Sequence, residues 1–335
     1  MKPEHAPSRG FFGYGCDALA GVVSALILAF ALKHPATVLV LLAYLSALPL
    51  FVVGFSSGVL SALIAAVCGV AAIFATGPVD IGSFYFFAYA LPAVGLIFLS
   101  LRARPLPDGT IKWPSAGDML VALAVFPCLI FLIVYAQMMG HDGGLLAATT
   151  EAFKGLSGHI GDMLATSGQK TTPQELVKIQ DYVAFLARIA PAMAMGAWLL
   201  STALVMSAAH AFVERQTWGL RPPFALPQVR LPRWFVLLAL IFAAGSFAPA
   251  PYAYVALNLA IIFGIPLFFV GLAVAFDMAA HTRAPTLVLV VFYVALIVFP
   301  HLTLGVVMLG VVDHWVDFRK RFAEKAVYVK QGEKK

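Results

Sequence analysis

The strongest constraint on the fold is the spacing of the charged residues, which are missing from long stretches of the chain. No Asp, Glu, Lys or Arg occurs between Lys33 and Asp80, a run of 46 residues, or between Arg233 and Asp277, a run of 43. An ionised side chain is costly to bury in a bilayer. A helix needs about 20 residues to cross about 30 Å of hydrocarbon. Each run is therefore long enough for two membrane-spanning helices.

Turn-forming residues divide these runs. The segment Gly54–Gly58 is predicted to separate two helices in the first run, and Pro249–Pro251 divides the second into a shorter and a longer helix. Further charge-free runs of 21, 23 and 25 residues each fit one span, and residues 18–32 supply the first span. The last run has 29 residues and is broken by Pro300. It predicts two short crossings or a re-entrant hairpin.

The basic residues indicate how the helices are oriented. With ten crossings and a cytoplasmic N-terminus, 17 of the 22 Lys and Arg residues fall on the cytoplasmic side and four on the other, with Arg188 inside a helix. This asymmetry is typical of membrane proteins. We therefore predict an all-α, polytopic transmembrane helical bundle of about 8 to 10 membrane segments with both termini cytoplasmic. Residues 1–14 form a cytoplasmic tail, 15–317 a single transmembrane helical domain, and 318–335 a basic cytoplasmic tail.

Composition excludes several classes of protein. A hydrophobic content of 61% with 11% charged residues and a mean hydropathy of +0.92 does not fit a nucleic-acid-binding protein or a disordered chain. Three cysteines in apolar surroundings are too few for a disulfide-stapled domain and show no metal-ligand spacing. We therefore predict no metal and no cofactor. The usual catalytic motifs are also absent, so the sequence does not favour an enzyme.

The segment 138–181 is predicted to be an extracytoplasmic insertion. Apolar residues recur at intervals of three to four over 145–165, which is typical of an amphipathic helix on a membrane surface. Thr172, Pro173 and Glu175 then form a strong helix start with a capping box. Continued to residue 213, this helix reaches about 60 Å, so its first turns stand outside the membrane. Pro191 is the expected site of a kink.

Three polar side chains in or near the spans are candidate ligand-binding residues: Arg188, Asn258 and His301. Arg188 fits either an interfacial position beside lipid phosphate or a pairing with an anionic ligand. Asn258 and His301 fit either a hydrogen bond between helices or the lining of a site. Small residues recur every four positions at 21–29 and 58–66, which predicts close helix packing or docking of a partner subunit.

Two segments resemble a known family. The stretch from Phe299 to Arg321, which includes the run 313–317 (Asp-His-Trp-Val-Asp), looks like the ending of the YybS-like family of uncharacterised bacterial integral membrane proteins. The segment Arg230–Trp234 resembles that family as well. The resemblance implies a multi-pass protein of the bacterial inner (plasma) membrane and, more distantly, a likeness to the substrate-binding subunits of vitamin transporters. It implies no catalytic residue.

The chemistry of this C-terminal segment can be examined directly. Asp313 and Asp317 share one helix face, and Asp317 can pair with Arg321 four residues later. Trp315 fits the headgroup level, and the basic tail that begins at Arg319 can meet anionic lipid. These five residues predict either an anchored helix end or a surface that docks a partner or lipid.

Two functional hypotheses follow. The first is a small-molecule binding or transport module, and the alternative is a non-transporting membrane scaffold for cell-envelope assembly. The expected partners are the lipid bilayer, a small-molecule ligand, and a membrane or cytoplasmic partner subunit. No nucleic acid is expected.

Overall fold

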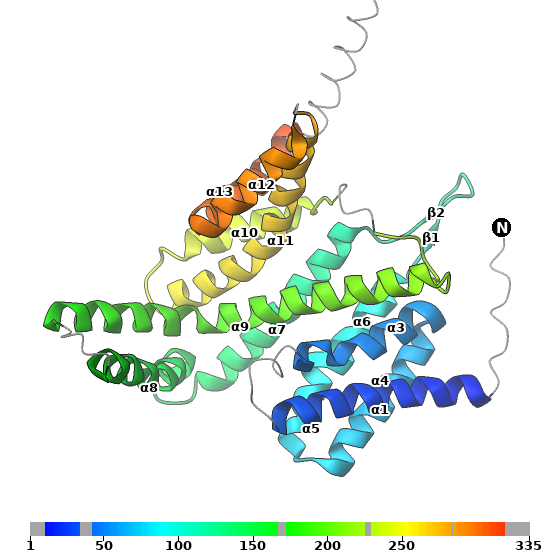
Figure 1. Ribbon diagram of the computed structural model, residues 1–335, viewed down its shortest axis with the longest axis horizontal. Helices are drawn as coiled ribbons and strands as arrows, with labels where there is room; N and C mark the ends of the chain where they lie inside the picture. The colour runs from blue at the N-terminus through cyan, green and yellow to red at the C-terminus, as the bar shows by residue number, and fades with distance from the viewer. Residues whose placement is uncertain (1–10, 34–41, 167–171, 225–228, 283, 319–335) are drawn as a thin grey trace, which may run out of the picture. The chain divides into compact units, whose positions relative to one another are not determined.

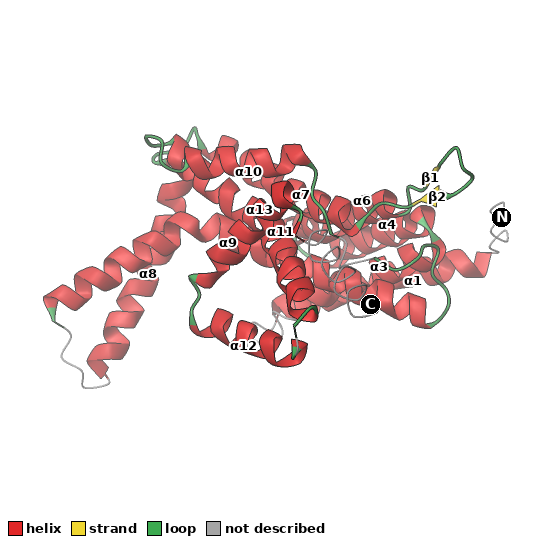
Figure 2. Cartoon of the chain, turned by 90° about the horizontal axis from the view of Figure 1, so that it is seen from above, coloured by secondary structure: helices red, strands yellow, loops and turns green. Residues whose placement is uncertain are grey.

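The computed structural model describes residues 11–33, 42–166, 172–224, 229–282 and 284–318. The regular secondary structure of these residues is helical apart from one two-stranded hairpin (Figures 1 and 2). Contacts divide the chain into two compact units, Met1–Leu123 with Trp198–Leu226, and Ala124–Ala197 with Pro227–Lys335. Helices α7 (Ala116–Met138) and α9 (Pro173–Arg215) contribute residues to both. The single domain that the sequence predicts over residues 15–317 stays a prediction.

Within the described residues, six helices are long and apolar enough to cross a membrane. They cover Gly13–Lys33, Val59–Thr76, Val79–Ser100, Ala116–Met138, Val177–Arg215 and Tyr252–Ala280. Shorter apolar helices lie at Leu42–Ser57, Arg233–Gly245, Pro285–Val298 and Leu302–Val316. The prediction of an all-α helical membrane protein is confirmed. The number of crossings and the sides on which the termini lie stay predictions.

The first unit is built around helices that pack through small residues. Its elements are α1 (Phe11–Lys33), η1 (Leu45–Ala47), α3 (Leu48–Ser57), α4 (Val59–Thr76), α5 (Val79–Tyr85), the π-helical segment η2 (Phe86–Ala90), α6 (Leu91–Ser100), β1 (Arg104–Pro105) and β2 (Ile111–Lys112), with parts of α7 and α9. A Cβ on Gly21 of α1 would fall on the carbonyl oxygen of Ala65 in α4, closer than 3.0 Å. Close packing through the small residues at 21–29 is therefore confirmed at Gly21.

The predicted breaks between helices are present, with one correction. α3 runs to Ser57, and the chain turns at Gly58 alone, which has a φ of 97°. The predicted five-residue turn over Gly54–Gly58 was therefore too long, because one glycine in the left-handed region is enough to end the helix. The break at Pro249–Pro251 is confirmed by α10 (Arg233–Gly245) and α11 (Tyr252–Ala280). The break at Pro300 is confirmed by α12 (Pro285–Val298) and α13 (Leu302–Val316).

Trp198 satisfies a backbone group that a proline leaves without its usual donor. Pro92 has no N–H, so the carbonyl of Ala88, four residues earlier, loses its regular helical partner. The indole Nε1 of Trp198 in α9 donates to this carbonyl oxygen at 2.8 Å. The bond joins α9 to η2 inside the first unit, next to the π-helical turn.

Asn258 also bonds backbone groups beside a proline, in the second unit. It is 0% exposed, and its Oδ1 accepts a hydrogen bond from the N–H of Ala192 at 2.9 Å, while its Nδ2 donates to the carbonyl oxygen of Arg188 at 3.1 Å. These two backbone groups pair with each other in a regular helix, and Pro191 lies between them. The amide of α11 therefore satisfies the backbone of α9 where the proline disturbs it.

α11 and α13 pack closely along one another in the second unit (Figure 1). A Cβ on Gly271 would overlap the carbonyl oxygen of Val306, and one on Gly310 would overlap that of Leu267, both closer than 3.0 Å. Backbone thus meets backbone, as in small-residue contacts between membrane helices. This contact places the end of α13 beside the middle of α11.

The helix predicted over 145–165 and the long helix predicted to begin at Thr172 are present as α8 (Gly144–Thr166) and α9, while the extracytoplasmic position of the segment 138–181 stays a prediction. The N–H of Thr172 donates to Glu175 Oε2 at 2.8 Å, and the N–H of Glu175 donates to Thr172 Oγ1 at 3.3 Å. The predicted capping box is therefore confirmed. α9 has 43 residues, or about 65 Å at about 1.5 Å per residue, and it passes through Pro191 as one helix. In Figure 2, α8 and the first part of α9 project away from α10, α11 and α13.

Candidate functional site

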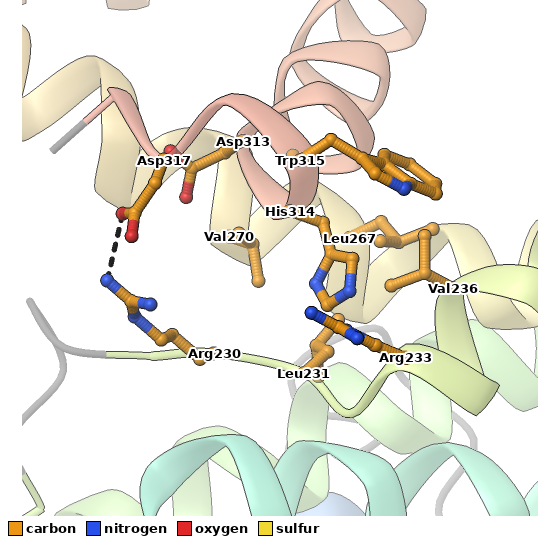
Figure 3. A pocket seen from close by; sticks show the side chains of 11 residues that line it. Arg230, Leu231, Arg233, Val236, Leu267, Val270, Asp313, His314, Trp315 and Asp317 are labelled. Carbon is orange, nitrogen blue, oxygen red and sulfur yellow. Dashed lines mark hydrogen bonds and ion pairs between the residues drawn. The ribbon is translucent and has the colours of Figure 1, made fainter. Parts of the chain in front are cut away.

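The two segments that resemble a known family are separated by α11 and α12 in the sequence and come together in the second unit. They line a pocket of about 390 Å³ at the C-terminal end of α13, which we call the α13 pocket (Figure 3). α11 completes its wall because the glycine contact holds it against α13. The lining consists of Arg230, Leu231, Arg233, Val236, Leu267, Val270, Gly310, Asp313, His314, Trp315 and Asp317.

The end of α13 is fixed by two aspartates. Asp317 adopts a left-handed conformation with a φ of 49°, which Asp tolerates better than most residues and which ends the helix. Its N–H donates to the carbonyl oxygen of Asp313 at 2.9 Å. The N–H of Phe318 donates to Asp313 Oδ1, also at 2.9 Å. Asp313 is only 5% exposed, so its carboxylate serves first to close the helix.

An ion pair joins the two segments across the α13 pocket. Arg230 Nη2 lies 2.9 Å from Asp317 Oδ1, and their side chains are 65% and 33% exposed (Figure 3). A pair this accessible to solvent contributes at most about 1 kcal/mol. The pair matters because it connects the loop before α10 to the end of α13. The sequence predicts Arg321 as the partner of Asp317. Arg321 lies outside the described residues, and the partner that the structure shows is Arg230.

On the other side of the pocket, two nitrogen-bearing side chains face each other. Figure 3 shows the imidazole ring of His314 and the guanidinium of Arg233 pointing toward one another. Nε2 of His314 is buried and has no hydrogen-bond partner among the described residues. Arg233 forms no ion pair with a carboxylate in the described part of the chain. A buried polar atom is normally hydrogen-bonded, so this corner is suited to a group that accepts hydrogen bonds and carries negative charge.

Of the other predicted docking residues, the structure describes Trp315. Trp315 lines the pocket and is 58% exposed. Arg319 and Arg321 lie outside the described residues. The sequence reasoning missed Arg233 and His314 as a pair. The only available signal was that both occur in segments with the same family resemblance.

Arg188, Asn258 and His301 do not come together. The side chain of Arg188 is exposed, and only its backbone carbonyl contacts Asn258. The amide of Asn258 is fully used in holding α9 and α11, so its interpretation as a hydrogen bond between helices is confirmed. His301 is exposed at the N-terminal end of α13, away from the aspartates that end this helix. None of the three lines the α13 pocket.

Apolar helices of this length, with buried polar groups satisfied by neighbouring helices, define a multi-pass helical membrane protein. The chain belongs to the family described as "Predicted membrane protein (DUF2232)", which matches residues 22–314 and has no known function. The match includes the α13 pocket up to His314. No curated protein and no solved structure matches the chain.

Proposed function

We propose that this protein is a bacterial inner-membrane protein that binds a small organic anion in the α13 pocket, as a binding or transport module. The observation that carries the proposal is the buried Nε2 of His314, which has no partner among the described residues and lies in a corner shared with Arg233. The volume of about 390 Å³ is within the usual range of small-molecule pockets, roughly 300 to 1,000 Å³.

The lining supports a ligand with two chemically different ends. A carboxylate can form two parallel hydrogen bonds with the guanidinium of Arg233 and accept a third from His314. The apolar part of the ligand can then lie against Leu231, Val236 and Leu267. Arg230 is occupied by Asp317, so it closes the far side of the pocket rather than competing for the anion. The predicted topology places this pocket on the cytoplasmic side.

Thermal unfolding of the full chain in phosphatidylcholine nanodiscs tests the proposal. Benzoate is the probe, and benzyl alcohol is its uncharged analogue. A ligand that binds only the folded state raises Tm with concentration. We expect benzoate, and not benzyl alcohol, to raise the Tm of the wild-type chain. Arg233→Gln should lose this response, whereas Arg188→Gln, an exposed arginine outside the pocket, should keep it. An equal response of Arg233→Gln, or none in the wild type, would refute the assignment.

The alternative, a scaffold for cell-envelope assembly, is supported by α12. No residue of this helix is buried by the described chain, and its 14 residues span only about 21 Å. Such an apolar surface can face lipid or a partner helix. Cross-linking in membranes followed by mass spectrometry separates the hypotheses: cross-links from α12 to envelope-synthesis enzymes favour the scaffold.

A further inference from the structure

A second pocket lies in the first unit, where the only described strands pair. β1 and β2 are antiparallel, with Arg104 directly opposite Lys112. Directly opposed residues project to the same face of a strand pair, where like charges repel. Together with Arg102 and Trp113 they help to line a pocket of about 350 Å³, which we call the hairpin pocket.

The charges of the hairpin pocket are not balanced by the protein. None of the three cations forms an ion pair with a carboxylate in the described part of the chain. The one acidic residue in the lining, Asp118, is engaged elsewhere, because its Oδ2 accepts hydrogen bonds from the N–H and the hydroxyl of Ser115, both at 2.8 Å. These bonds cap the start of α7. The pocket therefore keeps a net positive charge.

A buried arginine holds the base of the hairpin in place. Arg221 is 7% exposed; its Nη1 donates to the carbonyl oxygen of Ser100 at 3.2 Å and its Nη2 to that of Pro114 at 3.1 Å. Ser100 and Pro114 flank the loop that carries the pocket's cations. The guanidinium carbon also lies 3.6 Å from the ring centroid of Phe224. Burial lowers the pKa of Arg221 to about 10, which still leaves it charged at neutral pH.

We propose that the hairpin pocket binds a phosphate group, either of an anionic lipid headgroup or of a free phosphate. Arginine guanidinium groups match the geometry of phosphate oxygens, and an anion between Arg104 and Lys112 removes their mutual repulsion. The pocket directly follows the apolar helix that ends at Ser100 and precedes the one that begins at Ala116. This placement is that of a headgroup, with Trp113 beside it. The hairpin pocket shares no residue with the α13 pocket, so a negative result for one proposal does not contradict the other.

Native mass spectrometry of the detergent-solubilised full chain can test this site. The probes are phosphatidylglycerol, phosphatidylcholine and inorganic phosphate. Of phosphatidylglycerol and inorganic phosphate, the wild type binds at least one. We expect the double variant Arg104→Gln/Lys112→Gln to bind that anion about 25-fold more weakly, since each basic residue near a membrane surface contributes about fivefold. The double variant Lys154→Gln/Lys178→Gln removes two exposed cations from α8 and α9 and should bind as the wild type does.

The probes also separate the two sources of phosphate. Binding of phosphatidylglycerol without inorganic phosphate assigns the site to lipid, and binding of inorganic phosphate assigns it to a free phosphate. Equal binding of phosphatidylcholine and phosphatidylglycerol with no binding of inorganic phosphate would overturn the proposal, as would binding of neither anion or equal weakening in both double variants. The hairpin variant should melt no lower than the wild type, because it removes a repulsion between opposed cations.

Discussion

The contact between α11 and α13 should be unusually sensitive to a single methyl group. In Gly310→Ala the new Cβ would lie 3.0 Å from the backbone nitrogen of Gly271 and 3.1 Å from the carbonyl carbon of Leu267, with the Leu267 oxygen closer still. All three atoms belong to the backbone, so no side chain can rotate out of the way. The helices must separate by on the order of 1 Å, and overpacking of this kind costs about 1 to 3 kcal/mol.

The same helix offers a matched control. A Cβ on Gly305 meets nothing within 4 Å, so Gly305→Ala keeps only the gain in helix propensity, up to about 1 kcal/mol. Both substitutions share the gain in helix propensity, so their difference is the cost of overpacking, about 1 to 3 kcal/mol, with Gly310→Ala the less stable variant. On α11, Gly271→Ala and the open Gly264→Ala form an equivalent pair, since only the former meets the backbone of Val306.

Reversible unfolding in mixed micelles with increasing dodecyl sulfate, followed by circular dichroism, measures these differences. Gly271→Ala and Gly310→Ala should not be additive in combination, because once the helices have separated the second methyl group costs little. The benzoate response of the α13 pocket should fall in both, since α11 and α13 supply facing walls. If Gly310→Ala proves as stable as Gly305→Ala, the backbone contact and the packing that forms the pocket are incorrectly described.

Three further outcomes are expected. Asn258→Leu should lower stability by about 1 to 2 kcal/mol in the same unfolding assay, because it strips buried backbone groups of α9 of their partner. Arg221→Met should destabilise the chain by about 2 to 4 kcal/mol and increase hydrogen exchange at residues 101–113, since two carbonyl groups lose a charged donor. Hydrogen bonds from the backbone N–H and the hydroxyl of Thr172 lower the pKa of Glu175 below its ordinary value of 4.5. The ionised carboxylate of Glu175, which caps α9, therefore adds to the free energy of unfolding above pH 4.5, and this addition is lost as the pH falls through the lowered pKa. A carboxyl NMR titration of Glu175 should give a midpoint below 4.5, and Thr172→Val should raise it.

Features that depend on neighbours in the sequence were predictable. The helical membrane class follows from the long charge-free runs. Lipid excludes ionised side chains whichever helices become neighbours, so this prediction does not depend on the tertiary structure. The start of α9 at Thr172 and the breaks at Pro249–Pro251 and Pro300 follow from capping and from the missing proline N–H, which act within four residues. The turn at Gly58 was located to within a few residues, since several small residues there could have supplied it.

The tertiary structure alone decided which distant groups meet. Arg230 and Asp317 lie 87 residues apart, and Asn258 lies 66 residues from Ala192, so no local pattern links them. Both contacts depend on which helices pack against one another and at what height along their axes. Sequence therefore determined what this chain can bury in lipid and where its helices end. The pairing of helices, which brings partners together across tens of residues, determined where a pocket forms and which charges face it.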